Sequence, residues 1–407
     1  MKACVFTLGC KMNEVESESL MRGLEELGFE VTEELGYADL YLLNTCAVTA
    51  EAEKKSRQAV ARMRKFNSDA PVVVCGCASQ NNAEAFLQKE GVVLVTGAQG
   101  KDKILSLLSE RGIFRSADET FCELPLPKRT KTRAYLRIQD GCNRFCSYCL
   151  IPYLRGRTRS RAAQSVLEEA RAMNAKEIVL TGIDITSYRD GETDLSGLIK
   201  LLSEVPARIR LGSLEAGIVT KELLSAMKAA GNALPHFHLS LQSGSSKVLR
   251  AMNRHYTREV YLEKCALIYA HFPNAAITTD IIVGFPTETE EDFAQSLSVV
   301  KEAGFAKVHA FPYSRREGTA AAKMKEVPAS VKKERMGRML QAADAAEQAY
   351  LSRFLGSEQT VLYEEDGGYT ENYIRVYADG AREGGLYRMK LIEIKNDGVS
   401  AEIIEEL

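Results

Sequence analysis

In the first part of the chain, short apolar runs typical of strands are followed by stretches with the hydrophobic period of a helix. Short apolar runs at residues 3–8, 40–43, 72–74 and 92–95 have the length and composition of strands. Helical patterns follow them, around residues 14–27 and 50–65 after the first two runs. Strands that alternate with helices predict a doubly wound α/β domain with a mostly parallel sheet.

A second alternating series begins near residue 134. Six strand-like runs lie at residues 134–138, 177–180, 208–211, 236–241, 276–283 and 307–311. Helical patterns separate them at residues 162–174, 221–230, 258–270 and 290–303, and a long helical stretch at 330–354 closes the series. Six βα units favour an incomplete (βα)6 barrel of the TIM type over another flat sheet.

The last fifty residues change character. Short β-branched or aromatic runs lie at residues 358–363, 370–377, 386–394 and 400–404, and glycine-containing turns separate them. This pattern predicts a small antiparallel β-barrel. Pro125 and Pro127 mark a linker between the first two series. We therefore expect domains at residues 1–122, 133–354 and 355–407, with the linker at 123–132.

The composition is that of an ordinary globular protein, except for its cysteines. No apolar stretch approaches the length of a membrane span, and Met1-Lys2 leads directly into a strand-like run. We therefore expect a soluble cytoplasmic protein with no membrane association. Ten cysteines are many in a compartment that keeps thiols reduced, so clustered cysteines indicate metal binding or catalysis.

The formal net charge of −2 hides an uneven distribution. Between Lys128 and Arg161 there are ten basic residues and a single acid, Asp140, which gives a local charge of +9. Between Ser357 and Leu407 there are five basic and twelve acidic residues, a local charge of −7. Such asymmetry bears on partners rather than on fold.

Three cysteines, Cys142, Cys146 and Cys149, follow the first strand of the barrel series in the string GCNRFCSYC. Three thiolates on one loop can bind three irons of a [4Fe–4S] cluster and leave the fourth iron open to a substrate. Zinc would require a fourth Cys or His nearby, and none follows. The spacing therefore predicts a reactive iron–sulfur centre.

A second set of cysteines is scattered through the first domain. Cys10, Cys46 and Cys77 each follow a strand-like run, and the carboxyl ends of parallel strands gather along one edge of a sheet. A second three-ligand site is therefore expected there. Cys75 competes with Cys77, because alternation in a strand puts both side chains on the same face. The pattern alone does not choose between them.

At this point the residues resemble a known family. The string GCNRFCSYCLIPYLRGRTRSR resembles the radical S-adenosylmethionine methylthiotransferases, and the resemblance covers nearly the whole chain. TLGCKMNEVES, NTCAVTAEAEKKSRQ and CGCASQ resemble the family's N-terminal domain, which implies an auxiliary cluster on Cys10, Cys46 and Cys77. HLSLQSGSSKVLRAMNR and DIIVGFPTETEEDF resemble its central domain, and GYTENYIRV resembles the small RNA-binding domain called TRAM.

The resemblance also implies a substrate. Branches of the family modify N6-threonylcarbamoyladenosine beside the tRNA anticodon, N6-isopentenyladenosine at the same position, or an aspartate of a ribosomal protein. HAFPYSRREGTAA, HLSLQSGS and the TENY string look most like the threonylcarbamoyladenosine branch. The expected activity is therefore transfer of a methylthio group to C2 of that adenosine, with the other two substrates as alternatives.

The chemistry implied by the resemblance uses two [4Fe–4S] clusters and two molecules of S-adenosylmethionine per turnover. One molecule would bind the open iron of the cluster on Cys142, Cys146 and Cys149, and reduction would split it into methionine and a 5′-deoxyadenosyl radical. A second S-adenosylmethionine would methylate the sulfur carried by the auxiliary cluster. A low-potential electron donor is then required as a partner.

The carboxyl ends of barrel strands are where barrel enzymes place their sites. Polar or small residues at these ends are therefore candidate holders of S-adenosylmethionine, together with a tyrosine of the cluster loop; they are Tyr148, Thr181, Gly182, Ser213, Glu215, Ser240 and Gln242. Asp184, in LTGIDITSY, departs from the residue that the family resemblance leads us to expect, which leaves its role open.

The +9 stretch flanks the proposed radical cluster and favours an RNA partner, which the resemblance implies to be tRNA. Arginine binds phosphate well through its bidentate fork, so Arg155, Arg157, Arg159 and Arg161 are candidate RNA contacts. The basic helical segment from Lys54 to Lys65 can extend this surface.

The −7 terminal domain is a weak electrostatic binder of nucleic acid. It can stack bases on Tyr369, Tyr373 or Tyr377, bind a smaller RNA surface, or pack on the enzyme.

Two other functions compete with a tRNA methylthiotransferase. The same chemistry on a protein side chain is favoured by the acidic last domain, whereas the basic flank favours RNA. A non-catalytic iron–sulfur protein for electron transfer or RNA binding would have four cysteine ligands for each cluster. The two three-cysteine sets of this chain leave open irons and favour an enzyme.

Overall fold

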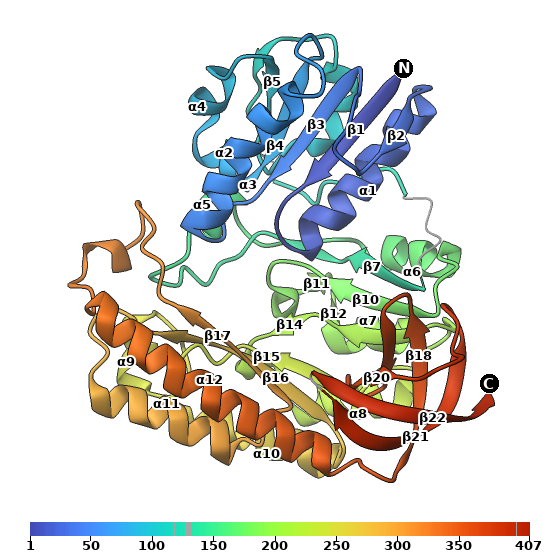
Figure 1. The fold of residues 1–407 in the computed structure, drawn as a ribbon, viewed down its shortest axis with the longest axis vertical. Helices are drawn as coiled ribbons and strands as arrows, with labels where there is room; N and C mark the ends of the chain where they lie inside the picture. The colour runs from blue at the N-terminus through green and yellow to red at the C-terminus, as the bar shows by residue number, and fades with distance from the viewer. Residues whose placement is uncertain (118, 127–131, 396) are drawn as a thin grey trace.

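The computed structural model describes residues 1–117, 119–126, 132–395 and 397–407. It consists of an α/β sheet at the top of Figure 1, an open barrel of parallel strands below it, and a small closed β-barrel at the lower right. This architecture confirms the expected fold class. No helix within the described ranges is long and apolar enough to cross a bilayer.

The upper part is a six-stranded parallel sheet in the order β2-β1-β3-β4-β5-β6. Its strands are β1 (Lys2–Thr7), β2 (Glu30–Thr32), β3 (Leu40–Thr45), β4 (Val72–Gly76), β5 (Val92–Val95) and β6 (Gly112–Ile113). The hydrophobic pattern did not indicate β2 or β6, which are short. From β2 the chain returns to β3 on the other side of β1, so strand order reverses at the carboxyl ends of β1 and β3, the usual place for a ligand.

Helices cover both faces of this sheet. On one face lies α1 (Lys11–Glu26), whose Leu20 and Leu24 are fully buried against the strands. On the other face lie α2 (Ala50–Arg64), α3 (Cys77–Asn81) and α4 (Ala83–Leu87). Helix α2 begins where the Thr49 side chain accepts a hydrogen bond from the Ala52 amide, a standard N-cap.

The central part is an arc of seven parallel strand segments, two of which are consecutive pieces of one strand, rather than a closed barrel. One sheet has the order β13-β10-β7 and the next β14-β15-β16-β17. The strands are β7 (Arg133–Arg137), β10 (Glu177–Thr181), β13 (Arg208–Leu211), β14 (Ser213–Leu214), β15 (His236–Leu239), β16 (Ala276–Val283) and β17 (Lys307–Pro312). β13 and β14 are separated only by Gly212, where a Cβ would lie 2.7 Å from the Leu180 carbonyl oxygen. Glycine therefore lets the strand pass from one sheet to the other.

Helices connect and cover these strands. The main ones are α6 (Ala163–Ala172), α7 (Leu195–Leu202), α8 (Lys221–Ala230), α10 (Arg258–His271), α11 (Glu290–Glu302) and α12 (Ala329–Ser352). Two short helices, α5 (Ile151–Leu154) and α9 (Ser246–Ala251), lie in loops. The long helix predicted to close the series is α12, which packs against β17.

The last part is a closed five-stranded barrel in the order β18-β19-β20-β22-β21. Its strands are β18 (Glu358–Glu364), β19 (Gly367–Thr370), β20 (Arg375–Tyr377), β21 (Leu386–Lys395) and β22 (Gly398–Glu406). The run predicted as one strand at 370–377 is instead interrupted: Thr370 ends β19, residues 371–374 form a turn with Tyr373 at φ +63°, and residues 375–377 form β20.

Buried charges hold this terminal barrel against the amino ends of the central strands. Glu177, at the start of β10, is fully buried and accepts hydrogen bonds from Arg133, Arg208 and Arg210. Arg210 also donates to the Glu371 carbonyl oxygen at 3.1 Å. Burial opposes ionisation of Glu177, but the three guanidiniums outweigh it and lower its pKa.

A second buried charge cluster joins the upper sheet to the open barrel. Glu16 of α1 accepts a bidentate pair from Arg155, with N–O distances of 2.9 and 3.1 Å. Arg155 is fully buried and also reaches Asn13 at 3.0 Å and Asp140 at 3.2 Å. Lys101 contacts the same Glu16 carboxylate. Burial alone would raise the Glu16 pKa, but Arg155 and Lys101 lower it below its usual value.

Replacing Arg155 with leucine should lower the free energy of unfolding by about 3–5 kcal/mol, because Glu16 and Asp140 would stay buried without their partner. The measurement is urea unfolding followed by circular dichroism. Arg157→Leu is the matched control, since Arg157 belongs to the same run but is exposed, and its effect should stay within about 0.5 kcal/mol. Equal losses in the two variants would contradict the proposed role of the cluster.

Candidate functional site

The loop that carries Cys142, Cys146 and Cys149 lies between β8 (Gln139–Asp140) and α5, and backbone contacts fix it on both sides. The Cys142 amide donates to the Gly156 carbonyl oxygen at 3.1 Å, and the Ser147 amide donates to the Met252 carbonyl oxygen at 3.0 Å. Gly141 has φ +72°, and a Cβ there would lie 1.9 Å from the Arg157 carbonyl oxygen. Only glycine fits this turn, which brings the start of the loop directly against the Gly156–Arg157 backbone.

Each sulfur of this loop has one N–H donor. The Arg144 amide donates to Cys142 Sγ at 3.4 Å, the Ile151 amide to Cys149 Sγ at 3.4 Å, and Arg254 Nη1 to Cys146 Sγ at 3.6 Å. Such donors stabilise thiolate charge and tune the potential of iron–sulfur clusters. The donor set therefore suits a cluster with three cysteine ligands.

Burial raises the pKa of the Cys142 thiol to about 11 and that of Cys149 to about 12. These thiols stay protonated near neutral pH unless a metal displaces the protons. Within the described part of the chain, no three His, Cys, Asp or Glu side chains are arranged to hold a single metal ion. A [4Fe–4S] cluster does not require three side chains to converge on one ion, because each thiolate binds a different iron.

The second set of cysteines comes together at the carboxyl edge of the upper sheet. Cys10 follows β1 and caps α1, Cys46 follows β3, and Cys77 begins α3 directly after β4. These three strands are neighbours. A Cβ on Gly9, which has φ +125°, would lie 3.0 Å from Cys46 Sγ, so the Cys10 turn lies directly against Cys46.

A cavity of about 360 Å³ opens at this edge. Its lining includes Gly9, Cys10, Cys46 and Lys55. The Val48 amide donates to Cys46 Sγ at 3.5 Å, and Arg155 Nε donates to Cys77 Sγ at 3.4 Å. The edge thus offers thiol ligands, N–H donors to sulfur and open space, which fits a second cluster.

Cys75 and Cys77 lie on opposite faces of the sheet, so the expectation that they share a face is wrong. Cys75 packs among the fully buried residues on the α1 face, whereas Cys77 packs on the α2 face. The cause is Gly76, whose φ of +103° ends the strand, and a Cβ there would lie 2.4 Å from the Thr45 carbonyl oxygen. This geometry selects Cys77 for the edge.

The two cysteine sets are mechanically linked. Helix α5 starts two residues after Cys149, and Leu150 and Leu154 pack into the same core as Cys77. Arg155 ends this segment and contacts both Glu16 and the Cys77 sulfur. One short stretch of chain therefore fixes the central loop relative to the edge of the upper sheet.

The strand-end candidates have different environments. Thr181 is buried at the end of β10, and Ser213 is exposed. Gly182 is closely packed, since a Cβ there would lie 2.9 Å from the Gln139 carbonyl oxygen. The Ser240 carbonyl oxygen accepts from Arg254 Nη2 at 3.1 Å.

The last two candidates also have defined surroundings. Gln242 has φ +71° and exchanges backbone hydrogen bonds with β16. Tyr148 is partly exposed and packs edge-on against Phe285.

Asp184 and Glu215 converge on Arg144 of the cluster loop. Arg144 Nε lies 3.0 Å from Asp184 Oδ2, and Arg144 Nη2 lies 3.4 Å from Glu215 Oε2. The Thr186 hydroxyl accepts from the same guanidinium at 3.0 Å. Asp184 therefore fixes the loop, which answers the question that its departure from the family pattern had left open.

Sequence reasoning missed Arg254 and Tyr256. Arg254 bonds Cys146, Ser240 and the Tyr256 hydroxyl, and that hydroxyl donates to the Ser240 and Leu241 carbonyl oxygens at 2.8 Å. No sequence spacing marks them, because they approach the loop from the turn after α9, where Asn253 has φ +59°.

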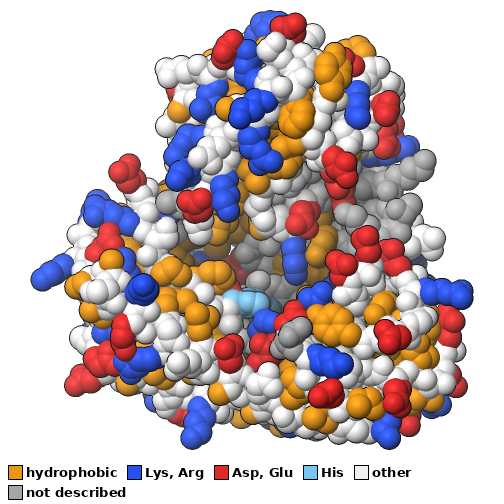
Figure 2. Space-filling view, viewed as in Figure 1, with side chains coloured by type: hydrophobic (Ala, Val, Ile, Leu, Met, Phe, Trp, Pro, Cys, Tyr) orange, Lys and Arg blue, Asp and Glu red, His pale blue; other side chains and the backbone are white. Residues whose placement is uncertain are grey.

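A polar cluster inside the open barrel was also missed. His238 Nε2 lies 3.1 Å from Asp280 Oδ2, and the His238 ring lies 5.9 Å from the ring of the exposed His309. Lys11 Nζ, one residue after Cys10, lies 5.5 Å from the Tyr135 ring on β7. Figure 2 shows a hollow between the parts of the molecule with histidine on its floor.

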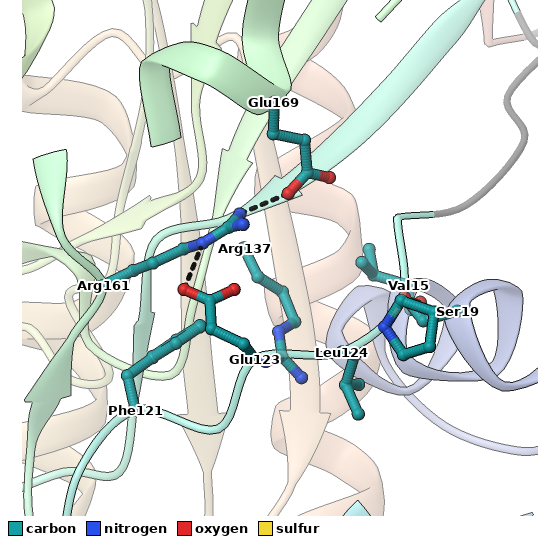
Figure 3. A pocket seen from close by; sticks show the side chains of 9 residues that line it. Val15, Ser19, Phe121, Glu123, Leu124, Arg137, Arg161 and Glu169 are labelled. Atoms are coloured by element: carbon teal, nitrogen blue, oxygen red, sulfur yellow. Dashed lines mark hydrogen bonds and ion pairs between the residues drawn. The ribbon is translucent and has the colours of Figure 1, made fainter. Parts of the chain in front are cut away.

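The positions of the arginines between residues 155 and 161 correct the prediction that all four bind RNA. Arg155, Arg159 and Arg161 are buried, so they are not available to phosphate. Arg159 pairs with Asp140, and Arg161 with Glu123 and Glu169 (Figure 3). Of the four candidates only Arg157 is exposed. Lys128, Arg129 and Lys131 of the +9 stretch lie outside the described residues.

Two tyrosines of the terminal barrel, Tyr369 and Tyr373, pack against other side chains of this protein. Tyr373 stacks on His236 at 4.4 Å and on Tyr369 at 4.8 Å. The guanidinium of Arg210 lies 4.7 Å from the Tyr373 ring. Of the three uses considered for this acidic domain, the structure shows packing on the enzyme, so stacking of RNA bases on Tyr369 or Tyr373 is ruled out in this conformation. Tyr377 donates to Asp397 at 2.7 Å.

The chain is similar in sequence to known protein families and to curated enzymes. Residues 136–300 match the Radical SAM superfamily, and residues 2–97 match the uncharacterized protein family UPF0004. A threonylcarbamoyladenosine tRNA methylthiotransferase from Bacillus subtilis is 35% identical, over 98% of this chain and 96% of the relative. A tRNA-2-methylthio-N(6)-dimethylallyladenosine synthase from Staphylococcus aureus is 32% identical, over 98% and 84%.

A solved structure shares the fold. The radical S-adenosylmethionine methyltransferase TsrM from Kitasatospora setae, solved with cobalamin and a [4Fe–4S] cluster, superimposes with a TM-score of 0.59 and 15% identity, over 79% of this chain and 77% of that one. Sequence identity of 32–35% to curated methylthiotransferases, over almost the full length of this chain, identifies the family. The chain is an enzyme that belongs to the radical S-adenosylmethionine methylthiotransferase family.

Proposed function

We propose that this enzyme transfers a methylthio group to C2 of N6-threonylcarbamoyladenosine beside the anticodon of tRNA. The observation that carries the proposal is the presence of two three-cysteine sets, joined by the short segment that ends at the buried Arg155, in a chain 35% identical to an enzyme named for that reaction. Two sets with open positions suit two tasks, one that generates a radical and one that supplies sulfur.

Cys142, Cys146 and Cys149 are proposed to hold the [4Fe–4S] cluster whose open iron binds S-adenosylmethionine. Bound to these three cysteines and reduced by a low-potential electron donor, such a cluster would supply the electron for reductive cleavage of S-adenosylmethionine to methionine and a 5′-deoxyadenosyl radical. The chain's own part is to hold the loop rigid. Arg144 fixes it to Asp184, and Arg254 neutralises charge on Cys146.

Cys10, Cys46 and Cys77 are proposed to hold the auxiliary cluster that carries the transferred sulfur. The cavity of about 360 Å³ beside Cys10 and Cys46 is space that such a cluster would occupy. Arg155 donates to Cys77 and so opposes the negative charge of the thiolates. The loop anchored by α5 keeps this edge at a fixed distance from the first cluster.

The polar interior of the open barrel favours threonylcarbamoyladenosine over isopentenyladenosine. His238, Asp280, His309 and Lys11 offer hydrogen bonds and charge, which suit a substituent with a carboxylate and a hydroxyl. An isopentenyl group has no polar atoms with which to form hydrogen bonds to these groups, so it would gain less from binding here.

The exposed basic surface favours a polyanionic substrate. Helix α2 and the residue that follows it carry five exposed basic side chains, and Figure 2 shows Lys and Arg gathered on the upper left over this helix. They are Lys54, Lys55, Arg57, Arg62 and Lys65. Lys55 also lines the cavity beside Cys10. Phosphates bound here would place tRNA at the cysteine edge without reading its sequence.

The decisive assay uses enzyme reconstituted anaerobically with iron and sulfide, then given a reductant, S-adenosylmethionine and tRNA. Mass spectrometry of the nucleosides should show 2-methylthio-N6-threonylcarbamoyladenosine and no methylthiolated isopentenyladenosine. Cys142→Ala should abolish 5′-deoxyadenosine formation, whereas Cys265→Ala, a buried cysteine of α10, should not. A product on isopentenyladenosine alone would overturn the substrate, and a radical formed by Cys142→Ala would overturn the mechanism.

Cys77→Ala should remove about half of the iron and stop methylthio transfer while 5′-deoxyadenosine formation persists, because only the auxiliary cluster loses a ligand. Cys75→Ala is the matched control two residues away, and it should keep all the iron and the product. Iron analysis and product mass spectrometry are the measurements. Intact iron in Cys77→Ala would contradict the assignment.

Lys11→Met should lower kcat/KM for RNA with threonylcarbamoyladenosine by roughly 10- to 100-fold, the range expected for loss of a charge-assisted hydrogen bond. Glu14→Gln, one turn along the same helix, serves as the control and should cause no loss. Steady-state rates on a modified RNA hairpin measure both. An unchanged Lys11→Met rate would show that the carboxylate is bound elsewhere.

A further inference from the structure

Three side chains form an outward-facing platform at the rim of the cluster loop. Arg157 places its guanidinium 4.6 Å from the centre of the Phe145 ring, and Tyr153 meets that ring edge-on at 5.5 Å and 75°. Tyr153 is 65% exposed, and Arg157 is exposed as well. Phe145 is the residue before Cys146, so the platform borders the cysteine loop directly.

The backbone is strained to present this platform. Phe145 has φ +49°, a left-handed conformation that costs a bulky residue free energy. The Asn253 side chain stabilises it by donating to the Arg144 and Phe145 carbonyl oxygens at 3.1 and 3.0 Å. Strain of this kind persists where the surrounding structure holds a side chain in place for a function.

Arg157 differs from its neighbours in its charge environment. Arg155, Arg159 and Arg161 all turn inward onto carboxylates, whereas Arg157 pairs with no carboxylate among the described residues. An exposed tyrosine beside an unneutralised arginine is the combination that binds single-stranded nucleic acid, since the ring stacks on a base and the cation attracts phosphate.

We infer that Phe145, Tyr153 and Arg157 bind an unpaired nucleobase next to the modified adenosine, with Tyr153 as the stacking surface and Arg157 contacting the adjoining phosphate. This inference rests on the proposed tRNA substrate. Holding a neighbouring base on the loop rim turns the target adenosine toward the cluster. Recognition of this kind requires a single-stranded loop, because paired bases are already stacked.

The test uses reconstituted full-length enzyme and an RNA hairpin that carries threonylcarbamoyladenosine in its loop. 2-Aminopurine replaces, one at a time, the loop bases on either side of the target. Its fluorescence should fall on binding at one of these positions, and Tyr153→Ala should remove that change. Tyr153→Ala should also weaken hairpin binding by roughly 5- to 150-fold, the effect of losing one base–aromatic stack.

Three controls separate stacking from other effects. Tyr153→Phe keeps the ring and should restore both signals. Tyr37→Ala removes a tyrosine of similar exposure, 63%, outside the loop and should behave as wild type. The affinity for a fully paired RNA duplex should be the same for the Tyr153→Ala variant and for the wild-type enzyme. Equal iron content in all variants shows that the cluster loop is intact.

The outcomes also separate this inference from the proposed reaction. If wild-type enzyme makes the methylthio product and Tyr153→Ala binds the hairpin as tightly as wild type, the platform is not a base-binding site. If the wild type makes no product but binds the hairpin in a Tyr153-dependent way, the platform stands and the proposed reaction fails.

Discussion

The Glu16–Arg155 pair is the contact on which the arrangement of the molecule depends. Arg155 is fully buried, so its guanidinium must satisfy its donors inside the protein, and it does so with Glu16, Asn13, Asp140 and the Cys77 sulfur. These partners come from the helix after β1, the strand before the cluster loop and the start of α3. Breaking such a pair from one side leaves an unpaired buried charge, which is far costlier than losing a surface ion pair.

This constraint explains how two sites on separate sheets keep one geometry. Radical chemistry needs its reactants held within fractions of an ångström. The short path from Cys149 through α5 to Arg155 crosses from the open barrel to the upper sheet without a flexible linker. The longer connection between the two parts passes through residues 119–126, where Glu123 and Phe121 also contact Arg161.

Sequence periodicity predicted the three-part architecture and placed Cys10 and Cys46 at strand ends, because strand alternation and strand-end positions are local properties of the chain. Sequence patterns gave wrong predictions where the position of a side chain depends on partners from distant parts of the chain. The run from Arg155 to Arg161 looked like a phosphate-binding surface, but the acids that draw three of its arginines inward, among them Glu16 and Glu169, lie in other elements. Cys75 and Cys77 looked equivalent because period-two alternation assumes a continuing strand, and Gly76 ends it. His238, Asp280 and His309 come from three strands and have no shared motif.

The docking of the acidic terminal barrel has an electrostatic consequence for the whole molecule. Glu177 and its three arginines attach this barrel to the amino ends of the central strands, the end opposite the cysteine loop. The exposed cations of α2 border the cysteine edge, whereas the terminal barrel carries the excess of acidic residues. Local attraction and repulsion then act at different places on the surface. Repulsion from the acidic barrel reduces unproductive encounters of a polyanion there and leaves the cysteine edge as the better landing place.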